Sequence, residues 1–145
     1  MSFSLINELK SEHQQLLLAF QEIDGLGINS MLGRQKLIKL GRFLENHFKK
    51  ENAGVYMLLE KIAENDSNVM MMLYRNNRDL EDISDEIRSF FRFCTRMDAQ
   101  EICKDRYAMV KEQLKARIDR EELFIFESFL NVVSNMFDRC PAEPV

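Results

Sequence analysis

Residues 47–51, His47-Phe48-Lys49-Lys50-Glu51, place a histidine and a carboxylate four residues apart inside a long segment with helical apolar spacing. Residues four apart lie on one face of an α-helix, so both polar groups point the same way. A similar pair, Arg117 and Glu121, stands near the C-terminus. What the chain does depends on whether these two faces look towards water or into a core.

The composition predicts one all-α domain over residues 1–145. The chain has 145 residues, of which 46% are apolar, but only 5 Gly and 2 Pro, too few for the turns of an all-β fold. Apolar periodicity and turn signals predict helices over residues of about 2–24, 31–63, 67–96 and 98–138. Short connections between such helices predict an antiparallel up-down-up-down four-helix bundle.

Turn and cap residues separate the predicted helices. Gly25 and Gly27 are expected to end the first helix, and Asn29 or Ser30 to cap the second. Residues 98–101, Asp-Ala-Gln-Glu, have the form of a capping box and predict the start of the last helix.

Each predicted helix carries an apolar seam in which spacings of three and four alternate, as is typical of core-facing positions. The seams read Ile6, Leu9, His13, Leu16, Phe20 and Ile23; Leu37, Leu40, Leu44, His47, Glu51, Gly54 and Leu58; Met70, Leu73, Asn77, Leu80, Ser84, Ile87, Phe91 and Cys94; and Val110, Leu114, Arg117, Glu121, Phe124 and Ser128. Polar residues interrupt every seam near its midpoint. Because the midpoints of antiparallel helices come to one height, we expect six polar residues in one buried layer: His13, His47, Glu51, Asn77, Arg117 and Glu121.

Burying charges without partners costs several kcal/mol, so the layer must satisfy itself or hold a ligand. Three arrangements are open. The two histidines and two carboxylates, His13, His47, Glu51 and Glu121, are suitable ligands for a transition metal. Alternatively, the Arg117 guanidinium forks onto both carboxylates and makes a metal-free network. In the third, some side chains reach solvent and the register is off by one.

These segments resemble the hemerythrin-like family, the HHE cation-binding four-helix bundles. The resemblance lies in Glu12-His13, in His47-x-x-x-Glu51 followed by Tyr56, and in the segment from Arg117 to Phe126 with Glu121-Glu122. It covers roughly residues 5 to 130. In that family these positions hold a non-haem di-iron centre for oxygen binding, iron storage or sensing.

The chain departs from the family pattern at two positions. Asn77 stands where the third helix would supply a histidine, and Arg117 where the fourth would. The chain has only 2 histidines, which argues against a full di-iron centre and against reversible oxygen carriage. The resemblance therefore implies no bound cofactor or a single non-haem metal ion, which we expect to be iron.

A second resemblance points to a regulatory role. Residues 114–123, from Leu114 through Arg117 and Glu121 to Leu123, are similar to the last helix of the Rsd/AlgQ family of bacterial sigma-factor-binding regulators. This likeness implies a non-enzymatic domain that binds a protein partner such as a sigma factor or a signalling protein. The sequence also offers no nucleophile–base constellation and no phosphate-binding loop.

Charge and hydropathy limit the functional classes to which the chain can belong. A net charge of −4 without a basic run predicts no direct binding to nucleic acid. No segment approaches the roughly 18 apolar residues of a membrane span, and no signal peptide is recognisable. Three cysteines without metal-ligand spacing suit free thiols in a reducing compartment. We expect a cytoplasmic protein of bacterial type that is a monomer or homodimer.

Overall fold

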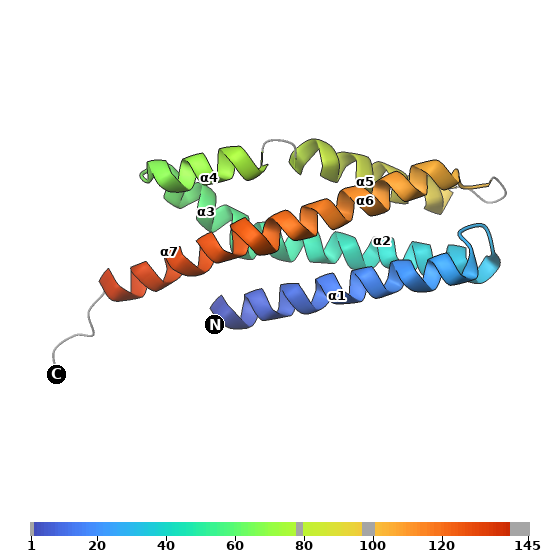
Figure 1. The fold of residues 1–145 in the computed structure, drawn as a ribbon, viewed down its shortest axis with the longest axis horizontal. Coiled ribbons are helices and arrows are strands. Elements are labelled where there is room, and N and C mark those ends of the chain that lie inside the picture. The colour runs from blue at the N-terminus through green and yellow to red at the C-terminus, as the bar shows by residue number, and fades with distance from the viewer. Residues whose placement is uncertain (1, 78–79, 97–100, 140–145) are drawn as a thin grey trace.

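The structure is a computed structural model that describes residues 2–77, 80–96 and 101–139 (Figure 1). Within these ranges the chain forms helices and turns and no strand, which confirms the all-α prediction. The elements are α1 (Ser2–Leu26), α2 (Met31–Glu51), the π-helical turn η1 (Asn52–Tyr56), α3 (Met57–Ala63), α4 (Ser67–Asn77), α5 (Leu80–Arg96), α6 (Lys104–Arg120), the π-helical turn η2 (Glu121–Ile125) and α7 (Phe126–Arg139).

The elements join into long rods that lie side by side (Figure 1). α2, η1 and α3 follow one another without a break, as do α6, η2 and α7. α1 packs against α2 and against the α6–α7 rod, while α5 packs against α2 and α6, and α4 against α3 and η2. No helix in the described ranges is long and apolar enough to cross a membrane.

The turn between α1 and α2 uses Gly27 and Ser30 as the sequence indicated, whereas Gly25, the other glycine expected to end the helix, lies within α1. Gly27 has a φ of +90°, a conformation that favours glycine, and α1 ends just before it at Leu26. Ser30 caps α2 by accepting a hydrogen bond from the Gly33 N–H at 2.9 Å. Asn29, the other candidate cap, has a different partner.

That partner explains why α6 begins later than expected. The predicted capping box at residues 98–101 lies mostly outside the described residues, but Glu101 to Cys103 are not helical and α6 begins at Lys104. The Asn29 side chain donates to the Ile102 carbonyl at 3.2 Å and accepts from the Ile102 N–H at 2.7 Å. These two bonds hold a buried Ile102 in non-helical backbone, so a helix start near residue 98 is wrong for this stretch.

The third predicted helix, 67–96, corresponds to α4 and α5. Residues 78 and 79 between them lie outside the described residues, so the expectation of one unbroken helix is not tested there.

The predicted seams shift by one residue after each π-helical turn. After Glu51 the sequence pattern predicted Gly54 and Leu58 as core positions, but the structure buries Val55 and Leu59. A π-helical turn closes its hydrogen bond over five residues instead of four, so it adds one residue before the core face returns. A strict three–four spacing therefore fails at this point.

The same correction applies after Glu121. Phe124, a predicted core position, is 49% exposed, and Ser128 is half-buried, whereas Ile125 and Phe129 are buried. The π-helical turn η2 again accounts for the one-residue shift.

The hydrophobic core consists of two clusters with a polar layer between them. One cluster contains Leu16, Leu44 and Ile118, and the other contains Leu9 and Val55. His13 lies between Leu9 and Leu16 along α1, and it is completely buried. The fold thus places polar side chains where they are shielded from water on both sides.

Candidate metal centre

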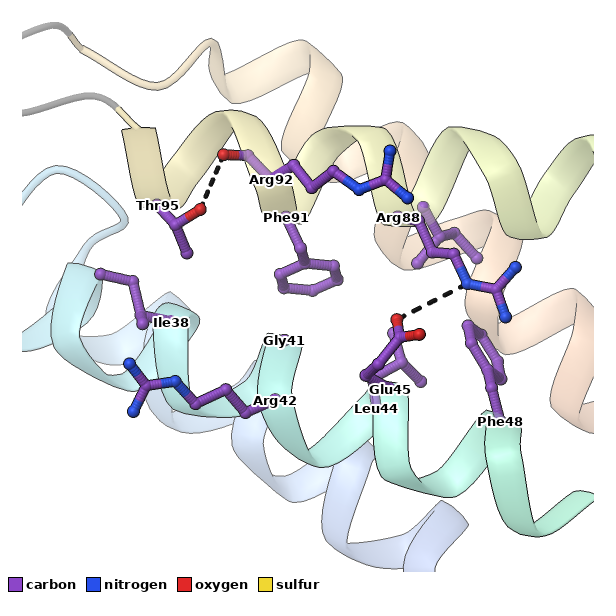
Figure 2. A pocket seen from close by; sticks show the side chains of 11 residues that line it. Ile38, Gly41, Arg42, Leu44, Glu45, Phe48, Arg88, Phe91, Arg92 and Thr95 are labelled. Carbon is purple, nitrogen blue, oxygen red and sulfur yellow. Dashed lines mark hydrogen bonds and ion pairs between the residues drawn. The ribbon is translucent and has the colours of Figure 1, made fainter.

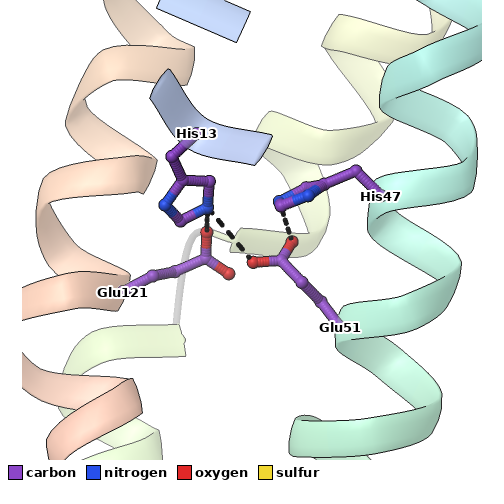
Figure 3. A group of neighbouring side chains, drawn as sticks. All are labelled: His13, His47, Glu51 and Glu121. Carbon is purple, nitrogen blue, oxygen red and sulfur yellow. Dashed lines mark ion pairs between the residues drawn. The ribbon is translucent and has the colours of Figure 1, made fainter. Parts of the chain in front are cut away.

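Four side chains predicted as metal ligands converge in this layer (Figure 3). His13 comes from α1, His47 and Glu51 from the end of α2, and Glu121 from the first position of η2. All four are at most 2% exposed. One ligand atom of each lies within 4.8 Å of the others.

The two carboxylates stand at equivalent places in their rods. Glu51 directly precedes η1, and Glu121 begins η2. Each is followed five residues later by a buried ring, Tyr56 after Glu51 and Phe126 after Glu121. π-Helical turns often occur at functional sites. Here they bring a carboxylate and a ring onto one buried face of each rod.

Tyr56 and Phe126, the rings that follow the two carboxylates, each contact one of the candidate ligands. The Tyr56 hydroxyl donates a hydrogen bond to Glu121 Oε2 at 2.7 Å. The Phe126 ring stacks on the His13 ring, with centroids 5.6 Å apart and planes inclined by 9°. These contacts fix the Glu121 carboxylate and the His13 imidazole in orientation.

Glu12 holds the second histidine. Its Oε1 lies 2.8 Å from His47 Nδ1, which leaves His47 Nε2 to face the layer, 3.2 Å from Glu51 Oε1. Lys50 pairs with the other oxygen of Glu12. A carboxylate behind a histidine is a common way to orient a metal ligand. The sequence singled out Glu12 only as the neighbour of His13, because its contact with His47 crosses between helices.

His13 reaches both carboxylates. Its Nε2 lies 3.6 Å from Glu51 Oε2 and 3.6 Å from Glu121 Oε1. Neither His13 Nε2 nor Glu51 Oε2 has a hydrogen-bond partner within the described residues, although both are buried. Figure 3 shows both atoms directed into the space between the four side chains. Buried polar atoms without partners are costly, so two of them aimed at one place point to a ligand.

The spacing of these atoms suits a metal ion. Four tetrahedral ligands about 2.1 Å from a metal ion lie about 3.4 Å from one another. The measured separations between histidine nitrogens and carboxylate oxygens are 3.2 and 3.6 Å. Two imidazoles and two carboxylates also form a donor set that iron and zinc accept. The four residues therefore fit a metal ion in both chemistry and distance.

Arg117 lies in the same layer. It is 4% exposed, and its Nη2 donates to Glu51 Oε1 at 3.3 Å, while its Nε lies 3.6 Å from Glu121 Oε1. A further nitrogen, Nη1, donates to the Ser84 hydroxyl. The guanidinium also covers the Phe48 ring at 4.1 Å from its centroid.

Asn77 does not lie in this layer as the sequence pattern predicted. It is half-buried at the end of α4, and Ser84 near the start of α5 supplies the buried polar group on this side. Asn77 instead lines a pocket of about 370 Å³ into which Tyr56, Ser84 and Arg117 also face. The three–four spacing predicted Asn77 as a core position, but the buried polar side chain on this side of the layer is Ser84 on α5.

The charges of the layer are strongly coupled. Burial, and next the Glu51 carboxylate, raise the pKa of Glu121 to about 7. Burial alone would raise the pKa of Glu51 as well, but its contacts with His13, His47 and Arg117 outweigh burial and lower it. Burial lowers the pKa of His13, yet its contacts with both carboxylates prevail and raise it to about 9. Without a metal, a protonated His13 and Arg117 therefore balance the carboxylates.

Removing Arg117 tests whether the layer depends on its charge. We expect Arg117→Ala to lower the free energy of unfolding by about 3–5 kcal/mol, because two buried carboxylates then face each other without a guanidinium. Lys115→Ala on the same helix is the matched control, since Lys115 is 47% exposed and its pairing with Glu112 is worth about 0.5 kcal/mol. Denaturant unfolding measures both, and an equally small loss for Arg117→Ala would contradict this account.

The pH dependence of stability tests the protonation of His13. The folded-state pKa of about 9 exceeds the ordinary value of 6.5, so the stabilisation is complete below 6.5 and is lost as pH rises through 9. We expect the free energy of unfolding of metal-free protein to fall by roughly 2–3 kcal/mol from pH 7 to 10. His13→Gln should remove most of this fall. A similar fall in wild type and variant would assign it to other groups.

Comparison with known proteins agrees with this geometry. A family model described as Hemerythrin HHE cation binding domain matches residues 4–128, which include all four candidate ligands and Arg117. Comparisons with curated proteins and with solved structures returned no match. The match covers most of the chain, and the chain belongs to the hemerythrin HHE cation-binding domain family.

Proposed function

We propose that this domain is an up-down-up-down four-helix bundle with a degenerate di-iron centre that retains one metal-ion site. His13, His47, Glu51 and Glu121 would hold the ion, which we expect to be iron. The observation that carries the proposal is the pair of buried atoms without partners, His13 Nε2 and Glu51 Oε2, directed into one space between four ligand side chains.

Arg117 supports the limit of one ion. Its guanidinium lies against Glu51 and Glu121, the two carboxylates that a second ion would have to share. A fixed positive charge there repels a second cation and occupies its space. Within the described residues the chain offers no third histidine, since His13 and His47 are the 2 histidines of the sequence.

The groups around the four ligands orient them or shield them from water. Glu12 keeps the Nδ1 proton of His47 engaged, so that Nε2 presents its lone pair to the ion. Tyr56 holds the outer oxygen of Glu121. The two apolar clusters exclude water on both sides of the layer. When bound, iron would supply a change of oxidation state or an open coordination position, which is the chemistry of a sensor.

We propose a regulatory, non-enzymatic role in which a protein partner, a sigma factor or a signalling protein, reads the state of this centre. Support comes from Leu123 and Phe124, which are 64% and 49% exposed on the same π-helical turn that carries Glu121. A change in how Glu121 binds would be transmitted directly to these apolar side chains. Exposed apolar groups of this size are typical of partner-binding surfaces.

Metal analysis of purified full-length protein tests the centre. After loading with ferrous iron and removal of excess, we expect close to one ion per chain by mass spectrometry. His47→Ala and Glu121→Gln should each reduce this at least about tenfold, because metal sites that lose one ligand bind far more weakly. Cys103→Ser is the control, since this exposed thiol lies outside the layer.

Three further outcomes decide between this proposal and its competitors. Arg117→His should raise the bound metal above one ion per chain, because it exchanges a repelling charge for a ligand. Two ions per chain in the wild type would contradict the degenerate centre. No metal in any preparation would instead favour a metal-free network of Arg117 with the two carboxylates.

A further inference from the structure

A groove lies between α2 and α5, on the surface near the polar layer (Figure 2). Its volume is about 190 Å³, and its floor is apolar, formed by Ile38, Leu44, Phe48, Ile87 and Phe91. For comparison, an apolar cavity of about 150 Å³ accommodates benzene. The groove therefore has room for a small apolar group.

Gly41 shapes the back of this groove. A Cβ added at Gly41 would lie 2.9 Å from Cδ1 of Phe91, so the ring packs directly on the α2 backbone. Figure 2 shows Phe91 projecting from α5 towards Gly41. The absence of a side chain at Gly41 thus lets an aromatic ring form a wall between the two helices.

The rim of the groove carries uncompensated positive charge. Arg42 on α2 and Arg92 on α5 are exposed, and the side chain of neither forms an ion pair or hydrogen bond within the described part of the chain. The carboxylate at the rim, Glu45, is 3.6 Å from the Nε of a third arginine, Arg88. The net charge of the chain is −4, yet Arg42 and Arg92 lie above an apolar floor without a paired carboxylate among the described residues. Their positive charges complement an anionic ligand.

The length of the groove suits a ligand with an extended alkyl chain. From Ile38 to Phe48 it follows eleven residues of α2, and the ten steps between them, at about 1.5 Å each, span about 15 Å. The Glu45–Arg88 ion pair bridges α2 and α5 across one end (Figure 2). A partner helix needs a groove that is open along its whole length, so this closure argues against helix docking.

We propose that the groove between α2 and α5 binds a medium-chain acyl carboxylate. The alkyl chain lies along the apolar floor against Phe48 and Phe91, and the carboxylate pairs with Arg42, whose guanidinium extends towards the Ile38 end of the groove (Figure 2), while Arg92 adds positive charge along the rim. An apolar body with a few placed polar groups at one end is the usual design of a small-molecule site.

Such a ligand would also contact Phe48, a side chain that lies next to the polar layer. The Phe48 ring lines the groove and contacts two guanidinium groups, with Arg88 at 5.3 Å and Arg117 at 4.1 Å from its centroid. An acyl chain that presses on Phe48 therefore contacts the neighbour of Arg117. The groove itself is formed without any metal ligand, so binding does not depend on the metal centre.

Sodium octanoate is a suitable probe. We expect octanoate, added to isotopically labelled full-length protein without metal, to shift the amide resonances of Gly41 and Thr95 saturably. The variant Arg42→Glu/Arg92→Glu should bind about tenfold more weakly, because it reverses both rim charges. Its matched control is Lys10→Glu/Arg75→Glu, which makes the same change in net charge at exposed positions away from the groove.

The outcomes separate the proposal from general surface effects. Retention of affinity within about twofold in the control variant, together with weaker binding of octan-1-ol than of octanoate, supports an acyl carboxylate site. The proposal is overturned if octanoate does not bind the wild type at millimolar concentration. Equal affinities for the wild type and the rim variant, or equal losses in both variants, overturn it as well.

Discussion

The structure depends on the burial of two carboxylates, Glu51 and Glu121, between two apolar clusters. Two such charges cannot face each other in a core unless cations stand between them or one of them takes up a proton. The chain meets this constraint with Arg117, with a His13 whose pKa is raised to about 9, and with a raised pKa at Glu121. The protons on His13 and Glu121 can leave in exchange for a metal cation, whereas the Arg117 guanidinium keeps its charge.

The chain belongs to the hemerythrin HHE family, and a guanidinium lies in its buried polar layer. Arg117 brings a permanent positive charge into a layer of carboxylates and imidazoles. A guanidinium neutralises a carboxylate as a metal ion does, but it cannot change oxidation state or leave. In the proposed degenerate centre, Arg117 takes the place of a histidine ligand, which would limit the chemistry that the layer can perform.

Much of the site follows from helical periodicity alone. His13, His47, Glu51, Arg117 and Glu121 interrupt apolar seams, and the structure brings all of them into one buried layer. The prediction works because α1 has no π-helical turn, and because in the other two rods these residues lie before the π-helical turn or, for Glu121, at its first position, so the three–four spacing still holds.

The rest depends on contacts that a single sequence does not reveal. Both π-helical turns shift the core by one residue, and Phe124 and Ile125 are equally plausible core residues from spacing alone. Asn29 delays α6 through a bond to Ile102, which lies 73 residues away in the chain. Glu12 orients His47 from a neighbouring helix. These features arise from pairs of residues that are distant in sequence, so no local pattern carries them.

The most direct test of a one-ion centre is an anomalous difference map at the iron absorption edge, from crystals of the full chain grown with ferrous iron. This account predicts one peak among His13, His47, Glu51 and Glu121, with the Arg117 guanidinium still against Glu51. Two peaks in the layer, or an Arg117 side chain displaced from it by metal, would contradict the account.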